Sequence, residues 1–432
     1  MRRRRHRGER PGHSATTAHF QAAYPFLAEG GLGAPGVYIG RDVCGGAWLY
    51  DPWQLYGRGL VGGTNMLVLG KLGRAKSSLV KTYLLRQQIF GRQAWVLDPK
   101  GEYGPLARAL GAEPIALAPD GLVRLNPLTR RGGFAAQLGL ARSILKAALD
   151  RKLTPEEDAG LRVALEIVNE EAGAGAEPTL PVLVDALLHP REEMVRGVSG
   201  TTREDFAAAN REAALALQRL CTGDLRGMFD GPSTPGLDLD APLVVLDLSA
   251  LEDSAALGIL ITCAAAWLQA ILVERKRLAE AQGRPSPKMI LVLDEVWRVA
   301  GHIGVAEWLQ SSFKLCRALG IQTILIAHRL TDFGAVGAAG SREALIVEGL
   351  IADADTIVIY AQAPDQLGLV ESELGRSSTE AQLLPTLRRG EALWVVGTHS
   401  GLVQHRISSF EAELADTDQR MRARPALGEA AA

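Results

Sequence analysis

The chain has 432 residues, which is too long for one average domain, so we expect two or three folded units. Hydrophobic residues make up 47% of it and charged residues 22%, which allows a sizeable core and is ordinary for a soluble globular protein. The formal net charge of −2 excludes a broad basic surface that binds nucleic acid through charge alone.

The charge is unevenly distributed, because residues 1–10 hold six Arg and one Glu, a local charge of +5. The rest of the chain carries 41 Lys and Arg against 48 Asp and Glu. No apolar stretch follows the basic start, which excludes a secretion signal. We expect a solvated tail there, and the alternative is a segment that contacts nucleic acid or an anionic membrane surface.

The four cysteines lie far apart and show no C-x-x-C spacing. This argues against a zinc site and a disulfide framework, and it fits a reducing cytosol. The cysteines are Cys44, Cys221, Cys263 and Cys316.

The first half of the chain alternates short apolar runs with helix-like segments. After a Gly-, Ala- and Pro-rich stretch, residues 36–60 predict a small β-hairpin with turn glycines. The run "NMLVLG" then precedes the helix-like "SSLVKTYLLRQQIF", and "RQAWVLD" and "EPIALAP" predict two more strands with a helix between them. This order is typical of a parallel sheet with crossover helices.

From about 133 to 228 the sequence has apolar residues at helical spacing and no strand-like run, which predicts an all-helical insertion. The strand-helix order then resumes with "LVVLDLS", "KMILVLDE", "IQTILIAH" and "ADTIVIYA", and "EALWVVGTHSGLVQHRIS" predicts a closing hairpin. We therefore predict an α/β fold with a mainly parallel sheet, interrupted by an all-helical insertion. The predicted segments are a basic tail at 1–35, a first α/β part at 36–132, the insertion at 133–228, a second α/β part at 229–410 and a flexible tail at 411–432.

One segment, residues 255–273, has 19 residues without a charge, about the length that spans a membrane. It is rich in Ala, contains Thr262, Cys263 and Gln269, and lies between two strand-like runs. A span would place those two strands on opposite sides of a bilayer, so we predict a buried helix instead.

Residues 70–77, "GKLGRAKS", match the phosphate-binding pattern G-x-x-x-x-G-K-S/T except that Ala75 replaces the second glycine. The required strand and helix flank them. Backbone N–H groups at such a helix start bind phosphate, the lysine adds charge, and the hydroxyl of Ser77 binds Mg²⁺. The alternative is a chance match. The candidate nucleotide-binding residues are Gly70, Lys71, Leu72, Gly73, Arg74, Ala75, Lys76, Ser77 and Ser78.

We expect a negative φ at Ala75, as in the first turn of a helix, so that its methyl group costs little.

The apolar run "MILVL" ends in Asp294 and Glu295, as in the second half of a P-loop NTPase. We predict that Asp294 helps to hold Mg²⁺ and that Glu295 orients and deprotonates the attacking water. The alternative is two acids that cap the next helix. The two motifs lie more than 200 residues apart, which suits the NTPases in which an extra strand separates the P-loop strand from the acid-bearing strand.

His328 follows the strand "TILIA", whose tip reaches the γ-phosphate in such sheets. A neutral imidazole can bond phosphate or the attacking water, and the alternative is a histidine that caps a helix or edges the core. Arg329 beside it has three alternatives: a sensor, a DNA contact or a surface charge. A further polar turn follows the strand after the P-loop helix and is expected near the nucleotide or a neighbouring subunit. That turn holds Asp98, Lys100, Glu102 and Tyr103.

Together, "GKLGRAKSSLVKT", "VLDPKGEYGPL", "GMFDGPST", "ILVLDEVWR" and "LRRGEALWVVG" resemble the ATPases of conjugative transfer and type IV secretion in the FtsK/HerA superfamily, most of all the TraC/TraG-type branch of actinobacteria. The resemblance covers about residues 36–408. It implies a RecA-like P-loop ATPase core with an all-α insertion, ATP and Mg²⁺ as cofactors, and a homo-hexameric ring. It also implies an arginine supplied by the next subunit, with Arg317, Arg342, Arg376 and Arg389 as candidates.

The sequence departs from that family in three ways. Ala75 replaces a glycine, and "AHR" ends the sensor strand where relatives usually have Gln after Thr or Ser. We also expect neither the large N-terminal domain of the secretion ATPases nor a pair of membrane spans. We therefore expect a cytoplasmic protein, or one held at the inner face of the cell membrane through protein contacts with secretion or conjugation components.

Three functions remain open at this point. The first is an ATP-hydrolysing motor that moves DNA or a protein-DNA complex in conjugation or secretion, with the cargo implied by the resemblance alone. The second is a nucleotide-gated assembly or scaffold protein with slow or no hydrolysis. The third is a helicase-like DNA-processing ATPase. The choice of ATP over GTP also rests on the resemblance.

Overall fold

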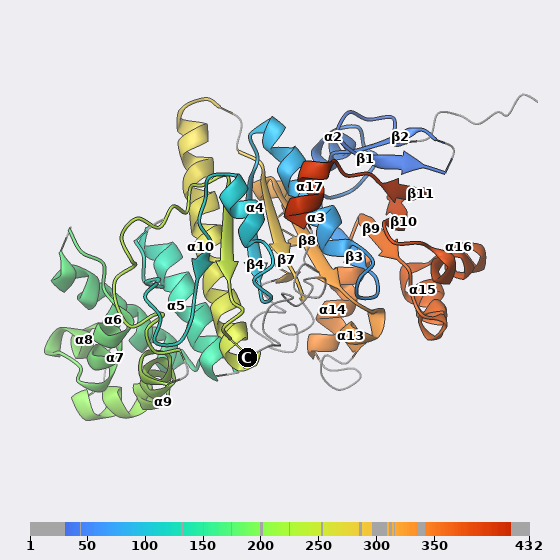
Figure 1. Cartoon of the computed structure of the whole chain (residues 1–432). Helices are drawn as coiled ribbons and strands as arrows, with labels where there is room; N and C mark the ends of the chain where they lie inside the picture. Colours follow the sequence, from blue (N-terminus) through green and yellow to red (C-terminus); the bar gives the residue numbers. More distant parts are fainter. Residues whose placement is uncertain are drawn as a thin grey trace, which may run out of the picture.

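The computed structural model describes residues 31–415 except 44, 131–132, 150, 174, 199–201, 224, 252–253, 285–286, 296–308, 311–312, 315 and 335–341. An 11-stranded sheet runs through the molecule in the order β2-β1-β11-β10-β9-β3-β8-β7-β4-β6-β5. Figure 1 shows the sheet flanked by helices, with a further group of helices, from residues 134–222, at one side of it.

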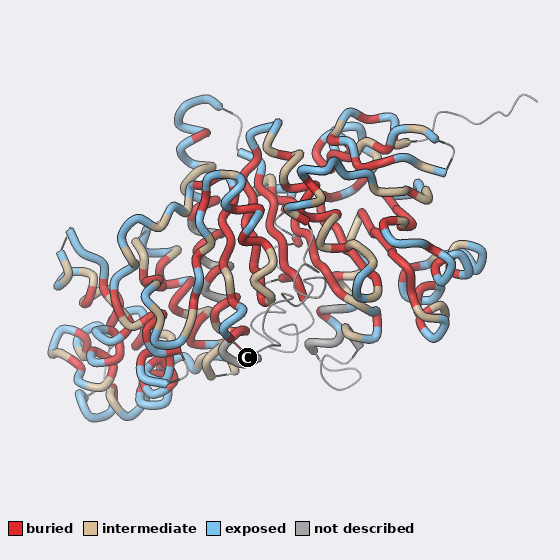
Figure 2. Tube along the Cα trace, viewed as in Figure 1, coloured by how far each residue is buried: buried red, intermediate tan, exposed pale blue. Residues whose placement is uncertain are grey.

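The strands from β9 to β5 in this order are parallel to their neighbours. Most are buried along their whole length, as their nearly unbroken apolar sequences favour, and they form the centre of the core (Figure 2). β8 lies between β3 and β7, so a strand separates the two motif-bearing strands as predicted. The bounds are β3 (Met66–Leu69), β4 (Gln93–Asp98), β5 (Ile115–Ala116), β6 (Leu243–Asp247), β7 (Met289–Leu293), β8 (Ile321–Ala327) and β9 (Thr356–Tyr360).

The rest of the sheet is antiparallel and joins the two ends of the described chain. The predicted hairpins β1–β2 and β10–β11 are both present, and β1 pairs with β11 while β10 pairs with β9. Rings of Trp48, Tyr50 and Trp394 pack against one another and fix this part of the sheet. The bounds are β1 (Val37–Asp42), β2 (Ala47–Tyr50), β10 (Glu391–Val396) and β11 (His399–His405).

The predicted buried helix at 255–273 is confirmed as part of α10 (Ser254–Ala281), in which Trp267 is buried. No helix within the described residues is both long and apolar enough to cross a membrane. The other helices around the sheet are α2 (Pro52–Gly57), α3 (Lys76–Gln87), α4 (Gly104–Ala109), α13 (Leu330–Gly334), α14 (Arg342–Ala352), α15 (Leu367–Leu374), α16 (Ser378–Leu383), α17 (Ser409–Ala415) and the 3₁₀ turns η1 (Gln88–Phe90), η2 (Pro364–Gln366) and η3 (Leu384–Thr386).

The described residues between 134 and 222 contain helices and no strand. Capping boxes at Thr154 and Thr202 begin two of these helices, and α5 packs against α10, which joins the group to the sheet. Figure 2 shows many buried residues within this group, and they are continuous with the hydrophobic core around the sheet. The bounds are α5 (Phe134–Leu149), α6 (Pro155–Ala172), α7 (Leu180–Leu188), α8 (Glu192–Gly197) and α9 (Arg203–Thr222).

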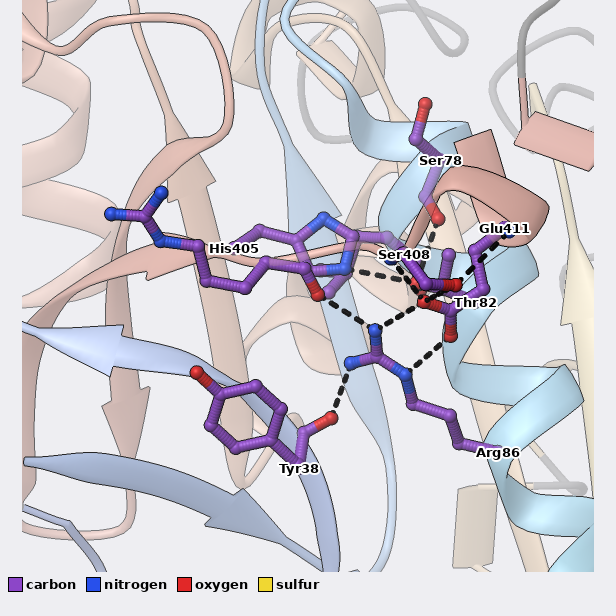
Figure 3. Close-up of polar contacts among 9 residues, drawn as sticks. Tyr38, Ser78, Thr82, Arg86, His405, Ser408 and Glu411 are labelled. Atoms are coloured by element: carbon purple, nitrogen blue, oxygen red, sulfur yellow. Dashed lines mark hydrogen bonds and ion pairs between the residues drawn. The ribbon is translucent and has the colours of Figure 1, made fainter. Parts of the chain in front are cut away.

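The C-terminal half of α3 is anchored to the far end of the chain (Figure 3). Arg86 forms a bidentate ion pair with Glu411 of α17, with Nε–Oε1 and Nη2–Oε2 distances of 2.6 and 2.8 Å. Its guanidinium also donates to the backbone oxygen of Tyr38 in β1. One turn earlier, the hydroxyl of Thr82 lies 2.9 Å from Nε2 of His405 in β11. The position of α3 is therefore tied to β1, β11 and α17.

The ends of the described chain are more ordered than the sequence predicts. Leu32 and Ala34 are buried in the core, although we expect a tail through residue 35. α17 continues to Ala415 with Glu411 buried, past the predicted start of the C-terminal tail at 411. Residues 1–30 and 416–432 of the two predicted tails lie outside the described part.

Candidate active site

Four motif-bearing segments meet at one edge of the sheet. The parallel strands β3, β8, β7 and β4 are neighbours in this order, so their carboxyl ends lie side by side. The glycine-rich loop follows β3, His328 follows β8, Asp294 and Glu295 follow β7, and the polar turn from Asp98 ends β4. The carboxyl edge of a parallel sheet is where such folds bind ligands.

A cavity of about 140 Å³ lies at this edge. It is lined by seven of the nine candidate loop residues, by both acids, and by His328. Gly70 and Lys71 are outside the lining and contribute backbone oxygens that hold Lys76. The lining residues are Leu72, Gly73, Arg74, Ala75, Lys76, Ser77, Ser78, Lys100, Glu102, Asp294, Glu295, His328 and Arg389.

The backbone of the loop requires a glycine at position 70 and places Ala75 in an unfavourable conformation. A side chain at Gly70 would place Cβ 2.4 Å from Cβ of Tyr360, so only glycine fits there. Ala75 has φ 77° and ψ 26°, in the left-handed region. The expected negative φ is therefore wrong, because Ala75 precedes the helix as its N-cap instead of joining its first turn. A non-glycine residue in this conformation costs roughly 1–2 kcal/mol.

Lys76 is buried at the start of α3, with its ammonium group facing the loop. Nζ donates hydrogen bonds to the backbone oxygens of Gly70 and Lys71, at 2.5 and 3.2 Å. It also lies 3.0 Å from Nδ1 of His328. Burial lowers the pKa of Lys76 to about 8, although the charge of Asp294 acts in the opposite direction.

His328 connects the lysine to the acid. Its Nε2 lies 2.7 Å from Oε1 of Glu295, while Nδ1 faces Lys76. An ammonium group can only donate, so Nδ1 accepts, and Nε2 then carries the hydrogen that it donates to the carboxylate. The imidazole thus holds the loop lysine and the candidate base in one hydrogen-bonded chain.

The two acids have different surroundings. Burial raises the pKa of Asp294 to about 6, and its Oδ1 accepts a hydrogen bond from the backbone N–H of Glu295 at 2.9 Å. Burial alone would also raise the pKa of Glu295, but bonds from His328 and Lys100 outweigh it and lower that pKa to about 2. Glu295 has φ 54°, a left-handed conformation that is rare for non-glycine residues and recurs at functional sites.

The polar turn after β4 reaches both acids. Lys100 forms an ion pair with Oε1 of Glu295, and the hydroxyl of Tyr103 lies 3.5 Å from Oδ2 of Asp294. The sequence predicts a polar turn near the nucleotide but does not predict these contacts. They depend on strand pairing, because β4 pairs with β7 in a register that brings Leu97 opposite Leu293, and no local signal in the sequence indicates that pairing.

The four candidate arginines differ in whether they line the cavity. Arg389 lines the cavity of its own chain, from a turn joined to the loop by a hydrogen bond between N–H of Gly390 and O of Arg74 at 3.4 Å. Arg317 and Arg376 are not among the lining residues, and the side chain of Arg342 lies outside the described part.

The residues present fit a magnesium nucleotide. Ser77 and Asp294 offer oxygen ligands in one cavity with two lysines and a helix N-terminus. No cluster of three or more His, Cys, Asp or Glu side chains in the described part of the chain is arranged to hold a metal. Mg²⁺ needs no such cluster, because it binds through one or two carboxylates together with substrate phosphates and water.

No family model matches the sequence, and no curated protein matches it. Among solved structures, VirB4 of Thermoanaerobacter pseudethanolicus is similar with a TM-score of 0.65 and 24% identity, over 89% of this chain and 100% of that one. The plasmid coupling protein TrwB is similar in a complex with a non-hydrolysable ATP analogue, with a TM-score of 0.54 and 16% identity over 82% of this chain and 87% of that one.

TrwB in complex with ADP and Mg²⁺ is similar as well, with a TM-score of 0.53 and 16% identity over 80% of this chain and 86% of that one. These likenesses confirm the predicted fold class, a RecA-like P-loop α/β fold, and show that the chain shares this fold with VirB4 and with the conjugative coupling protein TrwB. The actinobacterial type stays a prediction.

Proposed function

We propose that this chain binds and hydrolyses ATP with Mg²⁺ at the cavity after β3. The observation that carries the proposal is the contact of Glu295 with His328, which in turn contacts Lys76, inside a cavity lined by the loop. A site that only binds nucleotide needs no buried carboxylate beside the phosphates, because such an acid costs free energy unless it has a task.

Each residue has a role in this proposal. The loop residues 72–78, with the ammonium group of Lys76 among them, would bind the phosphates. Ser77 and Asp294 would hold Mg²⁺, which neutralises charge on the phosphates when bound. Glu295 takes a proton from the attacking water, and His328 holds that carboxylate in place through its Nε2–H. TrwB, a structural neighbour, is known in complexes with an ATP analogue and with ADP and Mg²⁺, which supports this ligand class.

We further propose that turnover drives transfer of DNA or a protein-DNA complex in conjugation or type IV secretion, in a homo-hexamer that contacts membrane components of the apparatus. This part is supported by the fold shared with VirB4 and with the conjugative coupling protein TrwB. The test is phosphate release by the full chain with and without DNA, beside Lys76→Ala. We expect DNA to stimulate phosphate release, and Lys76→Ala to abolish it. Phosphate release that DNA does not change would contradict the proposal of a DNA-moving motor.

A second function is a nucleotide-gated scaffold, which two observations favour. Ala75 strains the loop, and Glu295 is paired with two cationic or hydrogen-bonding groups instead of being open to water. In that case the chain binds ATP and assembles, but phosphate release stays at the level of a Glu295→Gln variant.

A further inference from the structure

The turn at the end of β4 places a lysine beside the candidate general base. The side chain of Lys100 lines the cavity and pairs with Oε1 of Glu295. Asp98 fixes the turn by accepting hydrogen bonds from the backbone N–H groups of Lys100 and Tyr103, at 3.2 and 2.8 Å. The backbone of Lys100 is thus held in place while its side chain reaches into the cavity.

The two partners of this ion pair are held to different degrees. The side chain of Glu295 is 4% exposed, and its Oε1 is also 2.7 Å from Nε2 of His328. The side chain of Lys100 is 29% exposed and carries its charge on a flexible four-carbon stem. A second anion in the cavity would therefore move Lys100 and leave Glu295 in place.

Such an anion follows from the proposed function, on which this inference rests. A base that activates water for attack on the terminal phosphate must lie next to that phosphate. Lys100 contacts the same carboxylate, so the terminal phosphate comes within its reach too. Lys76, at the start of α3, serves the phosphates bound along the loop. A diphosphate has no group at the terminal position and leaves the Lys100–Glu295 pair intact.

We infer that Lys100 is the residue by which this site distinguishes a nucleoside triphosphate from a diphosphate. When a triphosphate binds, Lys100 exchanges the carboxylate of Glu295 for the terminal phosphate. Glu295 keeps its contact with His328 and becomes available to the water. The base is therefore released only when the group to be cleaved is present.

The test measures binding, with the full chain and without turnover. Dissociation constants are determined by calorimetry for the Mg²⁺ complexes of a non-hydrolysable ATP analogue and of ADP. The variants are Lys100→Met, which keeps the length of the stem, and Lys100→Arg, which keeps the charge. Lys152→Met, an exposed lysine of the helical group, is the matched control, and Lys76→Ala is the control for the whole site.

We expect Lys100→Met to weaken binding of the ATP analogue about 10-fold or more, as for loss of a hydrogen bond between charged groups, with ADP changed less than about 2-fold. Lys100→Arg should bind the ATP analogue nearly as tightly as the unmodified chain does. Lys152→Met should change neither dissociation constant. Equal changes for both nucleotides, or none, would overturn the role of Lys100 and leave the proposed function standing. If the unmodified chain binds neither nucleotide, the proposed function fails and this inference fails with it.

Discussion

His328 lies between the two halves of the nucleotide motif, with Nε2 2.7 Å from Oε1 of Glu295. Its other ring nitrogen is 3.0 Å from Nζ of Lys76. The ATPase family that the sequence resembles usually carries a glutamine at the tip of this strand. An imidazole and a carboxamide share one property, since each offers a donor and an acceptor at once.

This geometry predicts different effects for two substitutions of His328. His328→Ala should lower kcat at least about 100-fold, because the carboxylate of Glu295 loses the hydrogen bond that orients it toward the water. His328→Gln should retain most of kcat, because the amide can accept from Lys76 and donate to Glu295. Steady-state phosphate release against ATP concentration measures both, and KM should change less than kcat. Equal activity of the two variants would contradict a bridging role.

The left-handed backbone at Ala75 predicts a stabilising glycine. Ala75→Gly removes a conformational cost of roughly 1–2 kcal/mol, partly offset by the greater entropy of glycine in the unfolded chain. We expect the free energy of unfolding to rise by about 0.5–1 kcal/mol, measured by urea denaturation.

The control for this prediction is Ala208→Gly, at an exposed position within α9. The same substitution there should lower the free energy of unfolding by about 1 kcal/mol, because the helix interior favours alanine. A loss of stability in both variants would show that Ala75 is not strained.

His405 predicts a loss of stability at acid pH. Burial, with help from the charge of Arg86 and against that of Glu411, lowers its pKa from 6.5 to about 4 (Figure 3). The unfolded chain therefore takes up a proton before the folded one does. The stabilising effect of neutral His405 is complete above pH 6.5 and is lost as the pH falls through about 4, a change of roughly 3 kcal/mol.

Urea denaturation at several pH values, compared with His405→Gln, measures this effect. The variant should be less stable than the unmodified chain at pH 7.5, because it loses the contact with Thr82. The difference between the two should shrink steadily between about pH 6.5 and pH 4. A constant difference across that range would show that His405 does not titrate as described.

The ion pair between Arg86 and Glu411 should contribute to stability more than a surface pair does. Both side chains are largely buried, and the contact is bidentate. A double-mutant cycle with Arg86→Ala and Glu411→Ala should give a coupling free energy of about 1–2 kcal/mol. The same cycle on the exposed pair of Arg162 and Glu166 should give about 0.3–0.5 kcal/mol. Equal values for the two pairs would contradict an anchoring role for Arg86.

Much of the fold follows from local patterns. The buried strands β3, β7 and β8 carry nearly unbroken apolar runs, and the position of β8 between the other two could be predicted from the spacing of the motifs. The sequence could not predict φ at Ala75, because the same local sequence is compatible with Ala75 in the first helical turn or as the left-handed residue before the helix. Nor could it predict the contact of Lys100 with Glu295, since that depends on the register of two strands far apart in the chain.

The pairing of β1 with β11 escapes sequence reasoning for a similar reason. Each hairpin is indicated by its own turn glycines, but nothing local specifies that the two hairpins join. Likewise, the sequence indicates only a charged helix residue at Arg86, because its ion pair with Glu411 depends on the packing of α17 against α3.

Glu295 is proposed as the base of a working ATPase, and a paired measurement of ATP binding and turnover decides whether it has this role. Binding of ATP with Mg²⁺ and steady-state phosphate release are measured for the unmodified chain and for Glu295→Gln. We expect both proteins to bind with similar affinity, and the variant to lose at least about 100-fold in turnover. Binding without any turnover above the level of Glu295→Gln would contradict the claim and favour the nucleotide-gated scaffold.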